Sequence, residues 1–210
     1  MKIGLIGLGS ISRQVCSMLA SINQDIDLIG FDDNINVDFN YTKSAFSSLL
    51  HDEYADINFV PCLGYNQFKL KEKLIGELLL HGRKVFSVIH PSAIISPTAS
   101  IGRGVIIFPG VIIDSNTKIH DGAVLNSGVI VSHNVNLEST CYLAPGVCIC
   151  VNVTIGKRTF IGAGSILSNE ITVGDDCIVG QGSNITRSIK IEVSCIGNPF
   201  KILKSKLTLK

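Results

Sequence analysis

An uninterrupted six-residue period of aliphatic side chains dominates the chain between Ile95 and Ile185. Every sixth position in this stretch is Ile, Leu or Val: Ile95, Ile101, Ile107, Ile113, Ile119, Leu125, Val131, Leu137, Leu143, Ile149, Ile155, Ile161, Leu167, Val173, Val179 and Ile185. An amphipathic α-helix needs apolar residues three and four positions apart, so this spacing excludes a helix. We therefore predict a β-helix of hexapeptide repeats, in which three flat faces close a triangular coil of about eighteen residues.

The residue two positions before each aliphatic residue is also small or β-branched, which predicts a second inward column. Cys141 and Cys177 fall in this column, where a thiol packs as a small hydrophobe. Cys148 and Cys150 flank the inward Ile149 and should point outward. None of the seven cysteines forms a C-x-x-C pair or a zinc-binding spacing, so we expect no metal and a reducing, cytoplasmic compartment.

The segment that precedes the repeats predicts a small, parallel, Rossmann-like α/β domain. A strand, a glycine turn, a helix and a second strand are expected in residues 1–30, and a second strand–helix–strand unit in residues 57–89. His90-Pro91-Ser92 then breaks the strand pattern. We place an α/β domain at residues 1–90, the β-helix at 91–189 and a basic tail at 190–210.

The charge balance is nearly even, with 18 basic and 17 acidic residues. It therefore predicts neither a nucleic-acid partner nor attraction to a membrane surface. The longest apolar run, residues 104–113, contains Pro109 and is too short to span a bilayer.

The turn after the first strand reads Gly7-Leu8-Gly9-Ser10 and resembles a phosphate-binding glycine loop. Glycine lets backbone N–H groups approach a pyrophosphate at a helix N-terminus, where the helix dipole favours anions. Asp32 and Asp33 follow the second strand and could accept hydrogen bonds from hydroxyl or amine groups. A nicotinamide dehydrogenase is one interpretation, but about ninety residues are too few for a full dinucleotide domain plus a catalytic domain. We favour a nucleotide-linked sugar, although the glycines could serve only the tight turn.

Several motifs resemble those of the sialic acid O-acetyltransferase and bacillosamine N-acetyltransferase family. They are the glycine turn, Phe31-Asp32-Asp33, Leu63-Gly64-Tyr65-Asn66, Ile89-His90-Pro91-Ser92-Ala93, the hexapeptide repeats and Gly197-Asn198-Pro199-Phe200. The resemblance covers nearly the whole chain and implies an α/β domain followed by a left-handed β-helix. It also implies a homotrimer with acetyl-CoA bound between adjacent β-helices. The nucleotide-sugar would lie on the N-terminal domain, at Gly7, Gly9, Ser10, Asp32, Asp33 and Asn66.

The same resemblance assigns catalysis to His133, in Val131-Ser132-His133-Asn134. Acetyl transfer needs a base for the attacking amine or hydroxyl and a hydrogen-bond donor for the oxyanion. Family members usually follow the histidine with Glu or Asp, whereas this chain has Asn134. Asn116, Asn134 and Asn152 are eighteen residues apart, so Asn134 could instead belong to a stacked amide ladder.

The oxyanion donor of the family is a glycine N–H one coil above the base, and Val151 occupies that position here. Tyr142 replaces a second histidine near the thioester, and it could either donate its hydroxyl or be an outward aromatic at a subunit seam. The resemblance places coenzyme A along Gly162, Ala163, Gly180, Gln181, Pro199 and Lys201, in addition to Tyr142. The glycines could also serve only the corners of the β-helix. His120 is expected to be a solvated surface residue.

We predict an acetyl-CoA-dependent N-acetyltransferase that modifies an amino group of a UDP-, dTDP- or GDP-linked sugar for bacterial surface glycans such as the O-antigen of lipopolysaccharide. O-acetylation of a sialic-acid-like sugar is the alternative enzymatic reading. A purely structural β-helix, such as an ice-binding scaffold, would need a flat threonine ladder. Only Thr154 and Thr172 share a coil position on one face, which disfavours it.

Overall fold

The chain divides into two compact units, Met1–Val88 and Ile89–Lys210. The computed structural model describes residues 1–22, 26–34, 42–204 and 207. The predicted third segment is not separate, because residues 190–204 continue the second unit. Within the described residues, no helix is long and apolar enough to cross a membrane.

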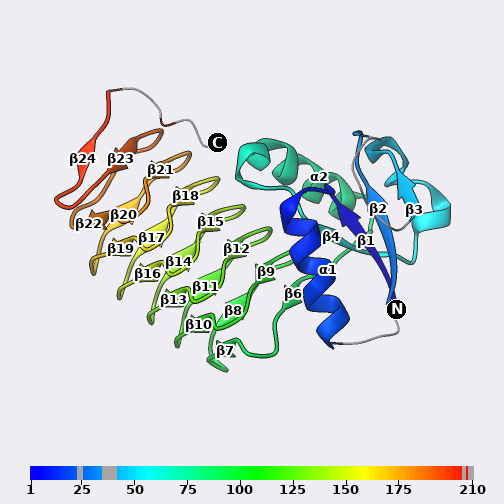
Figure 1. Cartoon of the computed structure of the whole chain (residues 1–210), viewed down its shortest axis with the longest axis horizontal. Helices are drawn as coiled ribbons and strands as arrows, with labels where there is room; N and C mark the ends of the chain where they lie inside the picture. Colours follow the sequence, from blue (N-terminus) through cyan, green and yellow to red (C-terminus); the bar gives the residue numbers. More distant parts are fainter. Residues whose placement is uncertain (23–25, 35–41, 205–206, 208–210) are drawn as a thin grey trace. The chain divides into compact units, whose positions relative to one another are not determined.

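The first unit is a parallel α/β sheet with strand order β3-β2-β1-β4-β5. Its elements are β1 Lys2–Ile6, α1 Ser10–Ile22, β2 Asp27–Phe31, β3 Thr42–Ser44, η1 Phe46–Ser48, η2 Asp52–Tyr54, β4 Asn58–Pro61, η3 Tyr65–Gln67, α2 Phe68–Leu80 and β5 Lys84–Val85 (Figure 1). The sequence did not predict β3, whose three residues are polar and partly exposed. The strand expected at the end of this domain is split at Phe86-Ser87 into β5 and β6 Val88–Ile89, which join different sheets.

Strand order fixes where this domain can bind a ligand. The chain leaves β1 toward β2 and later enters β4 on the other side of β1, so the strand order reverses between β1 and β4. In open α/β sheets, ligands bind at the carboxyl ends of the strands at such a reversal. The glycine turn after β1 and the segment Cys62–Gly64 after β4 flank this position.

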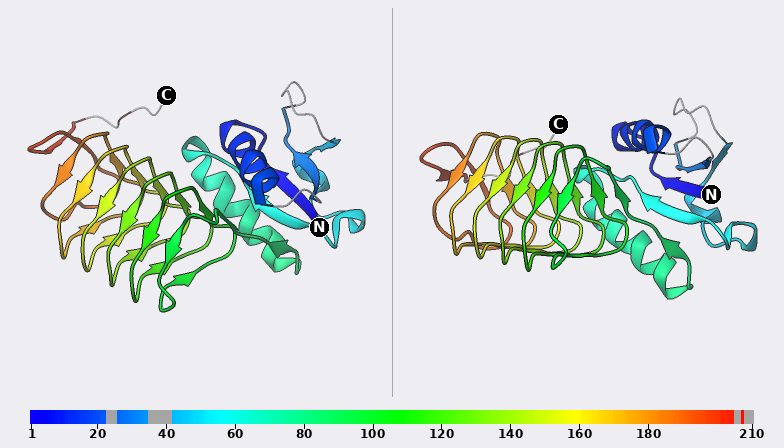
Figure 2. Two further views of the ribbon diagram at one scale, coloured as in Figure 1. Left: turned by 60° about the horizontal axis from the view of Figure 1, so that its bottom comes forward. Right: turned by 90° about the horizontal axis from the view of Figure 1, so that it is seen from below.

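The second unit is a parallel β-helix with three faces, and successive coils lie on one another in both views of Figure 2. The eight-stranded face contains β6, β9 Ile106–Ile107, β12 Val124–Leu125, β15 Tyr142–Leu143, β18 Phe160–Ile161, β21 Ile178–Val179, β23 Ser194–Ile196 and β24 Lys201–Ile202. The six-stranded face contains β7 Ile94–Ile95, β10 Ile112–Ile113, β13 Ile130–Val131, β16 Cys148–Ile149, β19 Ile166–Leu167 and β22 Asn184–Ile185. The five-stranded face contains β8 Ser100–Ile101, β11 Lys118–Ile119, β14 Asn136–Leu137, β17 Thr154–Ile155 and β20 Thr172–Val173.

The register confirms the eighteen-residue coil. Ile112 pairs with Ile130, and Val124 pairs with Tyr142, each one coil further along the chain. The aliphatic column and the small-residue column both line the interior, where Leu143, Cys141 and Cys177 have no exposed surface. Both inward columns of the sequence prediction are therefore confirmed.

From Gly104 onward, most corners of the β-helix turn through left-handed backbone. The corners that join the eight-stranded to the six-stranded face use glycine, at Gly110, Gly128, Gly146, Gly164 and Gly182, with φ between 65° and 71°. The corners that join the six-stranded to the five-stranded face use Asn116, Asn134 and Asn152, with φ of 56–58°, and then Glu170, with φ of 61°. Asparagine tolerates this conformation better than other residues with a side chain, which explains its recurrence there.

Candidate active site

His133 and Asn134 form one corner between the six-stranded and five-stranded faces, which we call the His133 corner. The turn lies between β13 and β14, and its backbone is held by both neighbouring coils. The Asn134 N–H donates to the Ser115 carbonyl at 3.0 Å, and the His133 carbonyl accepts from the Asn152 N–H at 3.3 Å. His133 is half-buried and Asn134 is exposed.

Among the residues that the structure describes, no hydrogen bond or ion pair holds the His133 ring. In particular, no hydrogen bond joins it to the Asn134 amide. Nor do the described contacts join the side-chain amides of Asn116, Asn134 and Asn152 into a ladder. Because these three residues share a left-handed φ, backbone conformation accounts for their spacing without a ladder.

Val151 lies one coil above His133, as predicted, but its N–H is already engaged. It donates to Oδ1 of Asn169 at 3.0 Å. The amide can therefore bind an oxyanion only if Asn169 releases it. Asn169 is a residue of this corner column that the sequence analysis did not single out.

Tyr142 is almost fully buried on the eight-stranded face, with 7% of its surface exposed. Its ring stacks on Phe160 with a centroid distance of 5.5 Å, and its hydroxyl accepts from Nδ2 of Asn126 at 3.0 Å. The ring and the hydroxyl of Tyr142 are therefore both engaged within one chain.

The glycines in residues 162–164 and 180–182 serve two different purposes. Gly164 and Gly182 turn corners with left-handed φ. Gly162 and Gly180 do not: a Cβ at Gly162 would lie 2.5 Å from the Gln181 nitrogen, and a Cβ at Gly180 would lie 2.7 Å from the Ile196 side chain. Gly162 and Gly180 therefore allow close stacking of coils at these corners, without a left-handed φ.

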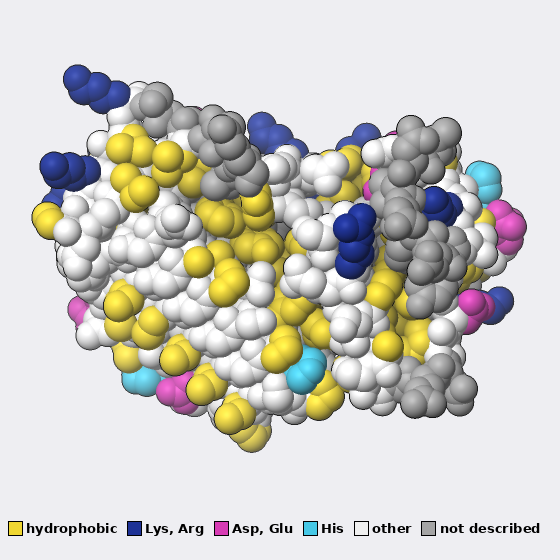
Figure 3. All heavy atoms as spheres, in the orientation of Figure 1, with side chains coloured by type: hydrophobic (Ala, Val, Ile, Leu, Met, Phe, Trp, Pro, Cys, Tyr) yellow, Lys and Arg dark blue, Asp and Glu magenta, His cyan; other side chains and the backbone are white. Residues whose placement is uncertain are grey.

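The candidate residues of the β-helix lie at two separate edges of the six-stranded face. His133 and Val151 lie where that face meets the five-stranded face, whereas Ala163 and Gln181 lie where it meets the eight-stranded face. Between these edges the outward positions carry exposed Ile94, Ile112, Ile130 and Ile166. Hydrophobic side chains recur along this part of the β-helix in Figure 3. One chain alone therefore does not bring these two sets of residues together.

Pro199 and Lys201 are exposed and lie in the C-terminal segment that ends with β24. This segment turns back antiparallel to β23, and Phe200 is buried at the end of the β-helix core. The Arg187 guanidinium lies 4.8 Å from the Phe200 ring centroid.

The glycine turn of the α/β unit has the geometry that its sequence predicts. Gly7 has φ of 86°, and a Cβ there would lie 2.7 Å from the Leu63 side chain. Around Gly9 there is open space on the side where a Cβ would be, and Ser10 begins α1. Asn66 is exposed in η3, which leads into α2.

Asp32 and Asp33 are already hydrogen-bonded within the domain. Oδ2 of Asp32 accepts from the Leu8 N–H at 2.7 Å, and Oδ1 of Asp33 accepts from the Phe46 N–H at 2.9 Å. Asp32 therefore shapes the glycine turn and occupies the Leu8 N–H.

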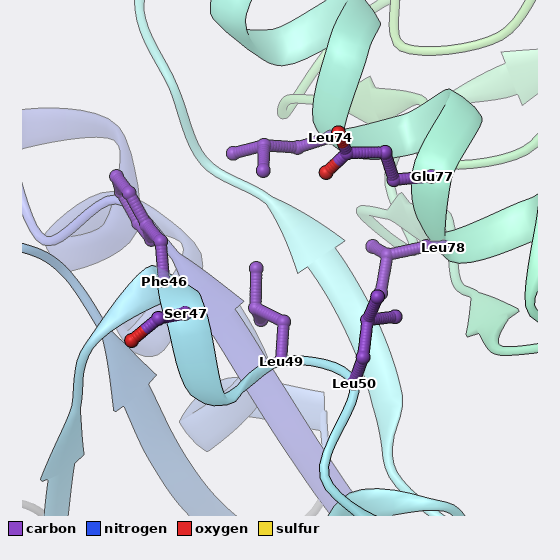
Figure 4. A pocket seen from close by; sticks show the side chains of 7 residues that line it. All are labelled: Phe46, Ser47, Leu49, Leu50, Leu74, Glu77 and Leu78. Atoms are coloured by element: carbon purple, nitrogen blue, oxygen red, sulfur yellow. The ribbon is translucent and has the colours of Figure 1, made fainter.

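A small apolar pocket in the α/β unit lies apart from the glycine turn. Its volume is about 120 Å³, and Figure 4 shows its lining residues Phe46, Ser47, Leu49, Leu50, Leu74, Glu77 and Leu78. Sites for drug-sized ligands have volumes of roughly 300–1,000 Å³, so this pocket does not fit a nucleotide-sugar.

His120 belongs to a network of hydrogen-bonded side chains that the sequence analysis missed. Asn136 donates from Nδ2 to Oε1 of Glu138 at 2.8 Å, so its Oδ1 faces Nε2 of His120 at 3.0 Å. An amide oxygen only accepts, and His120 Nε2 must therefore carry the proton. Spacing could have suggested the contact, because His120 and Glu138 occupy equivalent positions in adjacent coils.

Comparison with known proteins agrees with this architecture. A family model described as bacterial transferase hexapeptide (six repeats) matches residues 152–187. No curated protein matches the chain. The acetyltransferase domain of PglB from Neisseria gonorrhoeae FA1090 superposes with a TM-score of 0.88 at 25% identity, over 96% of this chain and 99% of that domain. The same domain has also been solved in complex with acetyl coenzyme A.

A second similar structure is a histidine-to-asparagine variant of perosamine N-acetyltransferase from Caulobacter crescentus, in complex with CoA and GDP-perosamine. It superposes with a TM-score of 0.88 at 27% identity, and the match covers 98% of both chains. WeeI from Acinetobacter baumannii AYE shares the fold, with a TM-score of 0.85 at 22% identity over 97% of this chain and all of that one.

Proposed function

We propose that this chain is a left-handed β-helix sugar acetyltransferase built on hexapeptide repeats, and that it transfers the acetyl group of acetyl-CoA to an amino group of a nucleotide-linked amino sugar. The observation that carries this proposal is the match over 98% of the chain, α/β unit included, to an N-acetyltransferase solved with CoA and GDP-perosamine. A match to the β-helix alone would support only the fold.

His133 is the proposed general base. Attack of the amine on the thioester carbonyl forms a C–N bond, and the amine must lose a proton as the coenzyme A thiolate leaves. A half-buried imidazole at a fixed corner can accept that proton. The oxyanion would bind the Val151 N–H once Asn169 has released it.

We further propose that the enzyme works as a homotrimer. The base corner and the glycine corners lie on opposite edges of the six-stranded face, so a complete site needs residues from a second copy. A closed three-fold ring would place the His133 corner of one copy beside a glycine corner of the next and cover the exposed isoleucines. Sedimentation of a monomer at micromolar concentration would contradict this arrangement.

The nucleotide end of the acceptor is assigned to the α/β unit, at the carboxyl ends of β1 and β4. Gly9, Ser10 and Asn66 offer exposed groups there. Since Asp32 already accepts from Leu8, it would order the glycine turn rather than bind the ribose. UDP-, dTDP- and GDP-sugars all remain candidates, and surface glycan synthesis in the cytoplasm, where acetyl-CoA is available, is the proposed setting.

The test is thiol release from acetyl-CoA in the presence of a panel of UDP-, dTDP- and GDP-linked amino sugars. We expect turnover with at least one amino sugar and none with its hydroxyl analogue. His133→Ala should lower turnover by about 10²–10⁴-fold while both substrates still bind. Full turnover in His133→Ala would remove the assigned base, and acetylation of the hydroxyl analogue alone would replace N-acetylation with O-acetylation.

A further inference from the structure

A buried threonine holds both ends of the His133 corner. Thr117 has no exposed surface and lies in the coil below. Its hydroxyl donates to the Ser132 carbonyl at 2.8 Å and accepts from the Val135 N–H at 3.3 Å. Ser132 and Val135 are the residues directly before and after His133-Asn134, so one hydroxyl fixes the entry and the exit of this corner.

The same pair of hydrogen bonds from a buried hydroxyl occurs at two other corners of the β-helix. Thr159 donates to the Gly174 carbonyl at 2.7 Å and accepts from the Cys177 N–H at 3.1 Å, across Asp175-Asp176. The Ser165 hydroxyl likewise spans Gln181-Gly182: it donates to the Gly180 carbonyl at 3.1 Å and accepts from the Ser183 N–H at 3.3 Å. Thr159 therefore provides a matched comparison at a corner that contains no candidate site residue.

The β-helix does not need a hydroxyl to turn the corner that carries His133. The inward positions equivalent to Thr117 in the other coils are all apolar: Ala99, Val135, Val153, Ile171 and Ile189. Those coils turn from the six-stranded to the five-stranded face without such a bond. Among these equivalent inward positions, only Thr117, beneath His133, carries a hydroxyl.

The His133 ring depends on this backbone for its position. Among the described residues no hydrogen bond or ion pair holds the ring, and Asn134 contributes a left-handed backbone with φ of 57°. The direction of the His133 Cα–Cβ bond is then set by the turn that Thr117 holds. A shift of about 1 Å at a catalytic group can lower the rate by about a hundredfold.

We infer that Thr117 is a positioning residue for acetyl transfer, which acts by fixing the backbone from which His133 extends. This inference rests on the proposed function of His133. Thr117 has no exposed surface, so it acts through the corner rather than by touching either substrate.

Thr117→Val, Thr117→Ser and Thr159→Val test this role in the full-length enzyme, at a temperature where all three are folded. Valine keeps the shape of threonine but lacks the hydroxyl, so Thr117→Val and Thr159→Val should lose comparable stability. We expect kcat to fall about ten- to a hundredfold in Thr117→Val with KM for acetyl-CoA nearly unchanged. Thr117→Ser should restore kcat, and Thr159→Val should keep it.

Equal kcat in Thr117→Val and Thr159→Val would overturn the inference, because general destabilisation would then explain both. The double variant His133→Ala/Thr117→Val separates the inference from the assignment of the base. If Thr117 acts through His133, the double variant should be no slower than His133→Ala. A further loss in the double variant overturns the role of Thr117, whereas full turnover in His133→Ala alone overturns the proposed base.

Discussion

Gly156→Ala should destabilise the β-helix by about 2–3 kcal/mol, although the sequence shows only one more glycine in a repeat. A Cβ at Gly156 would lie 2.5 Å from the Asp175 nitrogen, from Asp175 Oδ1 and from the Gly174 carbonyl carbon. Two of these three atoms belong to the backbone, so rotation of a side chain cannot relieve the contact. The coils would have to separate by about 0.9 Å to reach the 3.4 Å of ordinary contact.

That separation would break the hydrogen bonds that join these two coils. The Gly156 N–H donates to the Val173 carbonyl at 2.8 Å, the Lys157 N–H to Asp175 Oδ1 at 2.9 Å, and the Asp176 N–H to the Lys157 carbonyl at 2.9 Å. Each would lengthen to about 3.7–3.8 Å, beyond hydrogen-bond range. At a net value of about 1 kcal/mol each, their loss gives about 3 kcal/mol.

Urea unfolding followed by far-ultraviolet circular dichroism measures this loss as a lower midpoint of the β-helix transition. Gly76→Ala in α2 is the control, since a Cβ there meets nothing within 4 Å. It should stabilise the α/β unit by about 0.5–1 kcal/mol, because alanine favours a helix over glycine. An unchanged or raised midpoint for Gly156→Ala would refute the argument from coil contact.

Three further changes test the site. Asn134→Asp places a carboxylate beside His133 and stabilises the imidazolium, so the acidic limb of the pH–rate profile should move to higher pH; an unchanged profile would confine residue 134 to its backbone role. Gly9→Val should weaken binding of the nucleotide-sugar and leave acetyl-CoA affinity unchanged in isothermal titration, whereas equal loss of both would indicate misfolding. Asn169→Ala frees the Val151 N–H and should raise turnover by as much as about tenfold in the thiol-release assay, whereas a large fall would assign Asn169 itself to the site.

The amino-acid sequence determined the repeat architecture because the β-helix is periodic. Each coil repeats the environment of the one before it, so Leu143 and Cys141 could be placed inside from spacing alone. The α/β unit was also largely predicted, from the apolar strands and the amphipathic pattern of α1. The polar strand β3 was missed because its pairing with β2 depends on a neighbour that local composition does not reveal.

Only the tertiary structure decided what individual side chains do. Sequence spacing predicted that Val151 lies one coil above His133. It could not show that the Val151 N–H donates to Asn169 or that the Leu8 N–H donates to Asp32. The glycines looked alike in the sequence, and the structure separates left-handed corners such as Gly164 from close contacts such as Gly162. Hydrogen bonds and contacts between coils depend on distances of a few tenths of an ångström, which a six-residue period does not specify.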